Sequence, residues 1–351
     1  LNIRSKQKIV WRADASSTYL KASMTMYQAG QLPMYMLTWP DNRRNQYGIS
    51  ASWVLQIDSS LNVRINGRAD FITSRLVSSE AKDQVSIFGY PSASRADLLK
   101  NISLQVSKYI RGKIKTTAAI TYAERMPTAS ELYGFYLFNS SDGYDYTGNP
   151  KIGLEKSLQA EASVLYNWQK NRIQLTYYYS KVYNFITGMI EPSYSTMTIG
   201  ANGVKSFVNI PGATVSGVEA SGIMHLFTLV DLMTTLRYTT AKDKHNNPLP
   251  FIAPLKNVTS LRYQSKKFSA QLESELALKQ NRINTSSGED STPGYVLLHA
   301  RFGYNTTLFT NNLLFQAGVE NMLDKEYHEH LDWGNIPRPG RNIYLQIRLQ
   351  F

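Results

Sequence analysis

The last ten residues of the chain, 342–351, alternate between apolar and polar side chains. The apolar positions are Ile343, Leu345, Ile347, Leu349 and Phe351. A period of two is the pattern of a β-strand with one apolar and one polar face. A tilted strand of about ten residues is also long enough to cross a bilayer. The segment therefore predicts the closing strand of an outer-membrane β-barrel.

The same alternation recurs along the chain, as a transmembrane barrel requires. Between residues 171 and 185, for example, Ile173, Leu175 and Tyr177 alternate with polar or amphipathic residues. This pattern predicts about fourteen strands. Fifteen candidate segments carry the pattern, near 2–13, 16–27, 47–58, 61–73, 99–109, 114–124, 155–168, 171–185, 212–224, 229–241, 254–264, 268–280, 295–305, 312–321 and 342–351.

Long polar connections alternate with short turns between these segments. The long connections are 27–46, 74–98, 125–154, 186–206, 242–253, 281–294 and 322–341. Bacterial barrels have short periplasmic turns and long extracellular loops, an asymmetry that is not typical of β-sandwiches. We therefore expect an all-β transmembrane antiparallel β-barrel with extracellular loops. Because the last strand follows a long loop, the C-terminus is expected on the periplasmic side.

The composition fits a barrel in the outer membrane. The mean hydropathy of −0.32 suits a wall in which only alternate residues face lipid, and the 23 tyrosines suit membrane–water interfaces. The absence of cysteine excludes disulfides and cysteine metal sites. The net charge of +12 is scattered, without a nucleic-acid-binding motif. We expect contacts with lipopolysaccharide and outer-membrane lipids, and no nucleic-acid partner.

Catalytic signatures are absent from the sequence. There is no G-x-S-x-G motif, no phosphate-binding glycine loop and no H-E-x-x-H motif. We therefore expect that the chain is not an enzyme and carries no cofactor.

Three motifs at strand ends resemble, together and in order, the TonB-dependent receptor family of Gram-negative outer membranes. The first is 124–133 (ERMPTASELY) with 148–150 (GNP) and 154–157 (LEKS), and the second is 208–219 (VNIPGATVSGVE). The third is 318–327 (GVENMLDKEY) with 339–342 (PGRN) and the terminal aromatic residue. The signature residues are Arg125, Pro127, Glu131, Gly148, Asn149, Glu155, Asn209, Gly217, Glu219, Asn321, Asp324, Tyr327, Gly340, Arg341 and Phe351.

The chemistry of these residues favours a structural role. Gly217 lacks a Cβ atom, which suits a bulge or bend at a barrel rim. Asn321 and Asp324 have short side chains that bond to local backbone and favour a turn. Arg341 is expected to anchor the top of the strand through carboxylates or lipopolysaccharide phosphates.

The resemblance implies a longer protein than this chain. Family members have a barrel of twenty-two strands preceded by a plug domain and an energy-coupling box. Residues 1–351 are therefore expected to form the C-terminal portion of such a barrel, without a separate second domain. The expected partners are the TonB–ExbB–ExbD complex, the N-terminal plug and remaining strands, and the barrel-assembly machinery at the C-terminal strand. A rearranged, smaller barrel is the alternative.

Four methionines form a candidate metal site. Met24, Met26, Met34 and Met36 lie within thirteen residues, on or beside one expected extracellular loop. Thioether sulfur is a soft ligand that selects Cu(I), so these side chains are candidate copper ligands. Methionine also fills irregular gaps beside aromatic residues, and this packing role stays open.

Other candidate ligand-binding residues also lie on expected loops. His328 and His330 are spaced to share one face of a strand and to bind a metal ion or a ferric chelate. Trp39, Tyr133, Tyr136 and Tyr144 are aromatic candidates for a flat or apolar ligand. A solvated loop is the alternative for the histidines, and packing of a long loop explains the aromatic residues equally well.

The resemblance implies an active importer for a scarce ligand such as a ferric siderophore, haem, cobalamin, a metal ion or an oligosaccharide. The methionine and histidine clusters favour a metal ion or a metal chelate, and a copper-specific importer is one form of this hypothesis. A passive, porin-like channel and an adhesin are the alternatives from other functional classes.

Overall fold

One sheet of antiparallel strands makes up most of the computed structural model, which describes residues 2–4, 6–27, 30, 32–90, 94–308 and 311–350. Phe351, the expected end of the closing strand, lies outside these residues. Fourteen strands of at least nine residues are present in the described part of the chain, close to the number predicted. They are β2 (Gln7–Met26), β3 (Met34–Gln56), β4 (Leu61–Leu76), β5 (Ser94–Ile110), β6 (Ile114–Arg125), β9 (Glu155–Trp168), β10 (Asn171–Ile190), β11 (Val204–Phe227), β12 (Val230–Asp243), β13 (Lys256–Gln264), β14 (Phe268–Ala277), β15 (Tyr295–Leu308), β16 (Asn311–Glu320) and β17 (Asn342–Gln350).

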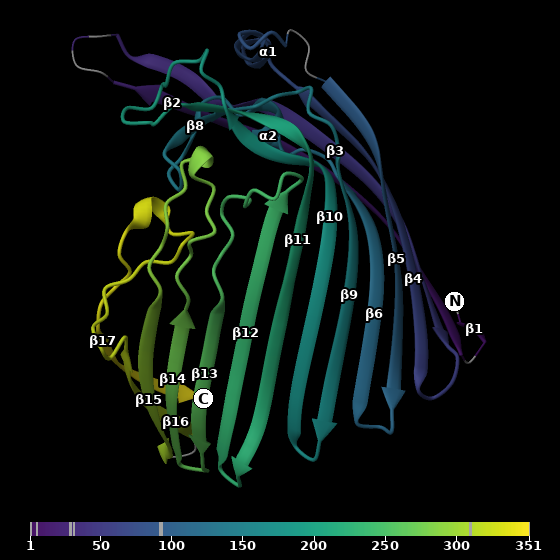
Figure 1. Cartoon of the computed structure of the whole chain (residues 1–351), viewed down its shortest axis with the longest axis vertical. Coiled ribbons are helices and arrows are strands. Elements are labelled where there is room, and N and C mark those ends of the chain that lie inside the picture. The colour runs from purple at the N-terminus through teal and green to yellow at the C-terminus, as the bar shows by residue number, and fades with distance from the viewer. Residues whose placement is uncertain are drawn as a thin grey trace.

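The long strands pair in chain order and form a meander. Each pairs with the next, and β6 pairs directly with β9. Three short strands, β1 (Asn2–Arg4), β7 (Leu137–Asn139) and β8 (Tyr144–Thr147), complete the sheet. In Figure 1 the long strands run side by side, with short turns at one end and long loops at the other. Strand β8 lies at the loop end and pairs in parallel with the start of β11.

The first hairpin differs from the sequence prediction. Residues 2–13 and 16–27 were expected as two strands, but β2 runs without a break from Gln7 to Met26. The expected loop 27–46 is mostly the first half of β3, which pairs with β2 from Gln7↔Leu55 to Met26↔Met34. At the loop end this hairpin extends beyond the wall and packs against loops. Neither of its faces has to be apolar there, so the alternation that marks the other strands is lost.

Neighbouring rows of side chains on the sheet have opposite character. Trp53, Ile65, Leu104 and Ile120 are paired across four strands, and each is between 36% and 57% exposed. The adjacent row is polar and hydrogen-bonded: Ser52 donates to Asn66 (2.7 Å), which donates to Ser103 (2.9 Å). This arrangement, apolar outside and polar inside, is the one expected of a barrel wall in lipid.

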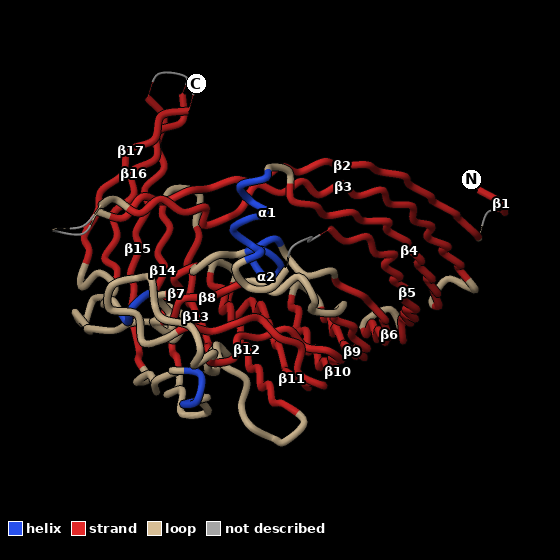
Figure 2. The backbone as a smooth tube through the Cα atoms, turned by 90° about the horizontal axis from the view of Figure 1, so that it is seen from above, coloured by secondary structure: helices blue, strands red, loops and turns tan. Residues whose placement is uncertain are grey.

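Most of the buried apolar side chains lie at the loop end. The largest buried cluster joins β3, β4, β5 and β10 to the long loops, and it includes Leu37, Ile72, Leu99, Ile186 and Leu132. Two short helices belong to these loops, α1 (Ser79–Ser86) and α2 (Ala129–Tyr133). Figure 2 shows α2, β7 and β8 inside the curve of the strands. No described helix is long and apolar enough to cross a membrane.

Helix α1 is attached to β3 through one side chain. Ser78 caps the helix by accepting a hydrogen bond from the amide of Ala81 at 3.0 Å. Gln84 then bridges the backbone of Leu37, accepting from its amide at 2.8 Å and donating to its carbonyl at 2.6 Å. The start of β3 is thereby covered by the loop that follows β4.

An arginine at position 175 tests which face of the wall meets lipid. Leu175 is 51% exposed on the apolar face of β10. Thr176 lies on the inner face, where it pairs with Glu219 of β11. We expect Leu175→Arg to lower the free energy of unfolding by about 2–4 kcal/mol, because a charge is placed in hydrocarbon. Thr176→Arg, the matched control, is expected to cost less than about 1 kcal/mol. Urea unfolding in lipid vesicles measures both, and equal losses would contradict the assignment of the faces.

Candidate functional site

The four methionines meet at the tip of the β2–β3 hairpin. Met24 pairs directly with Met36, and Met26 pairs with Met34. Directly opposed residues and alternate residues of a strand share one face, so all four side chains lie on the same face. Met36 is only 3% exposed, whereas Met24 and Met34 are 36% and 39% exposed. The tip therefore carries a row of thioethers that runs from buried to accessible.

A buried group of side chains, here called the mouth cluster, packs against the methionines. It consists of Met36, Phe135, Tyr136 and Val204, with Met26, Phe88, Tyr194 and Met197 packed against it. The ring of Phe88 lies 5.2 Å from the rings of both Phe135 and Tyr194. Sulfur–aromatic contacts stabilise such clusters. Packing thus accounts for Met26 and Met36, while Met24 and Met34 keep accessible side chains.

Among the predicted aromatic candidates, Tyr136 belongs to the mouth cluster, and burial raises its pKa. Tyr133 is 2% exposed in the larger apolar cluster, so it does not present a free ring. Trp39 donates from its indole nitrogen to Ser130 at 2.9 Å. Tyr133 and Trp39 are therefore part of the packing around α2, and only Tyr136 lies with the methionines.

The signature residues around α2 form one network of ion pairs and hydrogen bonds. Arg125 binds Glu131 at 2.8 Å and Glu155 at 3.2 Å. Glu131 also closes a capping box with Thr128 at the start of α2. Pro127 is fully buried. This network joins the end of β6 and the start of β9 to the loop between them.

Gly148 and Asn149 hold the second half of this loop against α2. A Cβ atom on Gly148 would lie 2.5 Å from the backbone nitrogen of Tyr133, so the close approach requires glycine. The amide of Asn149 donates to Glu131 at 2.8 Å, and its side chain donates to the carbonyl of Phe207 at 3.1 Å. The loop is thereby fixed to β11.

An ion pair buried in the mouth was not predicted from the sequence. Lys205 lies 2.6 Å from Asp142, and their side chains are 1% and 0% exposed. The lysine also donates to the carbonyl of Ser287 at 2.7 Å, and its ammonium lies 4.1 Å from the ring centre of Tyr144. Tyr146 donates to the same carboxylate at 2.7 Å, and burial together with this bond raises the pKa of Tyr146. Tyr144, a predicted ligand-binding residue, thus packs on Lys205.

A second buried carboxylate ties another loop to β8. Asp145 is 0% exposed, and one of its oxygens accepts hydrogen bonds from the amides of Met197 and Thr198, both at 2.9 Å. Its other oxygen has no hydrogen-bond partner among the described residues. These bonds hold loop 191–203 over β8, next to the mouth cluster.

The two histidines lie in the last long loop, as expected, and no strand alternation there places them on one face. Both ring nitrogens of His330 are engaged, with Glu289 and with Thr292, each at 2.8 Å. Glu289 is buried, which opposes ionisation, but its bonds to His330 and to backbone amides outweigh burial and lower its pKa. No group of three or more acidic or histidine side chains suited to a metal ion occurs in the described chain.

The closing turn before β17 is held by its signature residues. The side chain of Asn321 accepts from the amide of Lys325 at 2.9 Å and donates to its carbonyl at 2.8 Å. Asp324 accepts a hydrogen bond from the amide of Arg341 at 2.7 Å. The same carboxylate lies so close to Gly340 that a Cβ atom there would be 2.6 Å from it. The guanidinium of Arg341 donates to the carbonyl of Met322 at 3.0 Å, so its partner is backbone and not a carboxylate. The ring of Tyr327 packs at a tilt of 51° against the ring of Tyr295, with the ring centres 4.6 Å apart.

Gly217 does not mark a bulge, contrary to the sequence prediction. It lies within a regular stretch of β11, between Tyr178 of β10 and Thr239 of β12. A Cβ atom there would overlap the ring of Tyr178, which crosses the strand at this point. Glycine is needed because the Tyr178 side chain and the backbone carbonyl of Tyr238 both approach this position closely.

Two further signature residues make ordinary contacts near β11. Asn209 donates to the carbonyl of Asn184 at 2.7 Å and contacts the backbone of Gly153. Glu219 forms an exposed ion pair with Arg237 at 3.3 Å.

Comparison with known proteins agrees with this architecture. Residues 10–322 match the family model described as TonB dependent receptor-like, beta-barrel. The copper transporter OprC superposes with a TM-score of 0.81 at 22% identity, covering 98% of this chain and 54% of that one. The FrpB iron transporter from Neisseria meningitidis gives 0.70 at 11% identity, covering 98% and 52%. A point mutant of the ferric enterobactin receptor PfeA from Pseudomonas aeruginosa gives 0.65 at 15% identity, covering 99% and 60%.

At these identities the likeness shows the fold alone. The chain spans roughly half the length of these neighbours, between 52% and 60%. Comparison with curated protein sequences gives no match.

Substitution of Lys205 tests how strongly the mouth depends on the buried ion pair. We expect Lys205→Met to destabilise the fold of the mouth by about 3–5 kcal/mol, because Asp142 is left as an uncompensated buried charge. Hydrogen exchange of Tyr144–Thr147 measures the change. Arg237→Met is the matched control; its side chain is 72% exposed, and the loss of such a surface pair costs less than about 1 kcal/mol. Unchanged exchange in Lys205→Met would refute the role given to the pair.

Proposed function

Because the chain belongs to the TonB-dependent receptor family, we propose that it is the C-terminal barrel portion of an outer-membrane receptor that imports a scarce ligand. Residues 1–351 form a single portion of the barrel in this proposal, and a plug and further strands complete the whole receptor. The length ratio to the structural neighbours supports this extension.

The observation that carries the proposal is the inward-folded mouth. Loop 126–154 and loop 191–203 lie over the inside of the barrel end and are fixed there by Lys205, Asp142 and Asp145. A passive, porin-like channel has a polar, water-filled interior. A mouth packed with aromatic side chains and methionines suits capture of a ligand better than free diffusion.

The orientation and partners of the receptor follow from this proposal. The long-loop end, with the mouth cluster, faces the outside of the cell, and the short turns and the C-terminus face the periplasm. The TonB–ExbB–ExbD complex supplies the energy for import, acting through the N-terminal part of the receptor. The barrel-assembly machinery recognises the terminal strand, and lipopolysaccharide surrounds the loop end.

Sensitivity of uptake to an uncoupler distinguishes active import from passive diffusion. Cells that produce the complete receptor are supplied with copper or ferric citrate, and cell-associated metal is measured by mass spectrometry. Active import predicts that a proton ionophore reduces receptor-dependent uptake to the level of cells without the receptor. Receptor-dependent uptake that persists in the ionophore would support the porin-like alternative and overturn the proposal.

Copper is the ligand that the methionine row favours. The register brings thioethers from the two strands opposite each other, and Met24 and Met34 are accessible. Thioether ligands bind Cu(I) in preference to harder metal ions. The structural neighbour OprC, described as a copper transporter, supports the same choice. In this second proposal the β2–β3 tip is the first binding site for the metal.

A double substitution tests the copper site. Met24→Ala with Met34→Ala removes one thioether from each facing pair, and we expect at least a tenfold weaker affinity for Cu(I) in anaerobic isothermal titration. Met189→Ala with Met224→Ala is the control, because these methionines are also exposed but lie on β10 and β11. Equal affinity in both variants, or no binding by the parent protein, would remove the site.

A further inference from the structure

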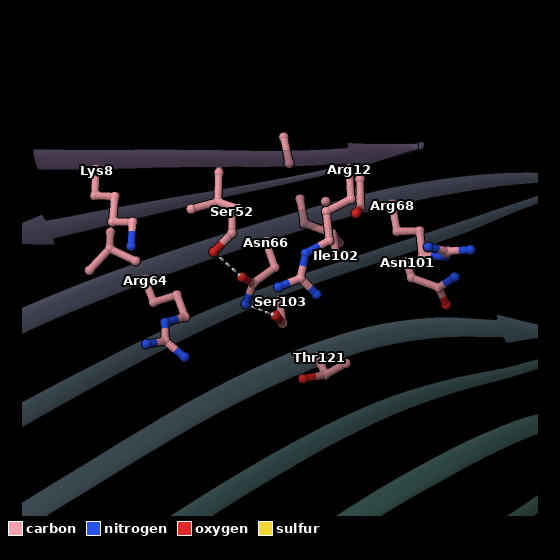
Figure 3. Close-up of a pocket in the computed structure, with 15 residues that line it drawn as sticks. Lys8, Arg12, Ser52, Arg64, Asn66, Arg68, Asn101, Ile102, Ser103 and Thr121 are labelled. Atoms are coloured by element: carbon pink, nitrogen blue, oxygen red, sulfur yellow. Dashed lines mark hydrogen bonds between the residues drawn. The ribbon is translucent and has the colours of Figure 1, made fainter. Parts of the chain in front are cut away.

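A groove rich in basic side chains lies on the inner wall, away from the mouth. Lys8 and Arg12 of β2 and Arg64 and Arg68 of β4 contribute to it, and its volume is about 580 Å³. In Figure 3 the basic side chains lie on the same side of the strands. The register places Lys8 and Arg64 in one row, on either side of Val54, and Arg12 and Arg68 in another, on either side of Ser50.

The groove belongs to the end of the wall that carries the short turns. Arg64 is three positions after Leu61, where β4 begins, and Val54 is two positions before Gln56, where β3 ends. The methionine row is at the opposite end of the same hairpin. The groove is therefore separate from the proposed copper site.

The lining of the groove carries positive charge without matching negative charge. Fifteen residues line it, and none of those described is acidic. Arg68 is neutralised from outside the lining, by Asp14 at 2.8 Å and by Asp70 at 2.5 Å. Lys8, Arg12 and Arg64 form no ion pair or side-chain hydrogen bond in the described part of the chain.

Several other basic side chains of the same inner face have carboxylate partners, although Arg172 and Arg262 do not. Arg95 pairs with Asp97, and Arg301 lies 3.0 Å from Glu273. Lys256 lies 2.9 Å from Glu275 and 2.7 Å from Glu329. Like charges that share one wall repel each other unless an anion lies between them. Three unpaired cations in one groove therefore indicate an anion that is supplied from outside the described chain.

Neutral polar groups between the cations complete a site for a small anion. Ser52, Asn66 and Ser103 form a hydrogen-bonded row across the groove, and Thr121 adds a further hydroxyl group. The two free guanidinium groups match carboxylate or phosphate oxygens, which they bind in a bidentate manner. The volume is within the range of small-molecule sites.

From this geometry we propose that the groove formed by Lys8, Arg12 and Arg64 binds a small polyanionic solute through its carboxylate or phosphate oxygens. The site goes beyond the proposed capture of metal at the mouth, and it does not require copper as the ligand. It is placed to hold an anionic solute near the periplasmic end of the barrel. Its binding can be measured without transport, so its failure leaves the proposed import untouched.

Isothermal titration of the complete receptor in detergent, at low ionic strength, tests the groove. Citrate is the carboxylate probe and pyrophosphate is the phosphate probe. We expect at least one of them to bind and to bind at least tenfold more weakly to Arg12→Gln/Arg64→Gln. Added salt is expected to weaken binding, because the attraction is electrostatic. The probe that binds more tightly identifies the chemical source of the oxygens.

The matched control removes the same charge elsewhere on the inner face. In Arg172→Gln/Arg262→Gln, the replaced residues bond only to Gln174 and Gln264 in the described chain, and we expect affinity within twofold of the parent. Absence of binding by the parent, or an equal loss in both variants, overturns the proposal. Thermal unfolding of Arg12→Gln/Arg64→Gln is measured in parallel. A lowered melting temperature with unchanged affinity assigns the cations to contact with another polypeptide segment and also overturns it.

Discussion

Pairing of backbone groups between neighbouring strands is the constraint on which this structure depends. In hydrocarbon an unpaired amide or carbonyl costs several kcal/mol, so the wall is a meander in which each long strand pairs with its neighbours. The side chains then follow the wall, apolar outside and polar inside, as in the rows of Leu104 and Ser103. The hydrophobic core is displaced to the loop end, where loops fold over the barrel.

The two ends of the first hairpin offer different chemistry. The loop end carries methionine side chains beside the mouth cluster, which suit a soft metal ion. The other end carries unpaired cations among hydroxyl and amide groups, which suit an anion. A free cation would be repelled by Lys8, Arg12 and Arg64, whereas a negatively charged metal complex would be attracted. If both sites act on one ligand, that ligand is therefore a negatively charged metal complex and not a free metal ion.

Strand period and motif order were sufficient to predict the family and most of the wall from the sequence, because alternation is a local property. Strand β10 was predicted at 171–185 and is found at Asn171–Ile190. The prediction failed at 34–46, where the hairpin extends beyond the wall and packs against loops. Contacts between distant residues were also missed, since Asp142 and Lys205 are 63 positions apart. The contacts of His330 with Glu289 and Thr292 are also between residues far apart in the sequence, and alternation could not predict them.

The placement of one positive charge beside the groove depends on a position that carries no side chain. Arg68 reaches Asp14 by lying across Gly48 of β3, where a Cβ atom would be only 2.2 Å from the guanidinium. A single methyl group at Gly48 would lift Arg68 from this path and weaken its link to Asp14. Arg68 would keep Asp70 as a partner, so such a change would shift the positive charge beside the groove without gaining or losing any ionisable residue.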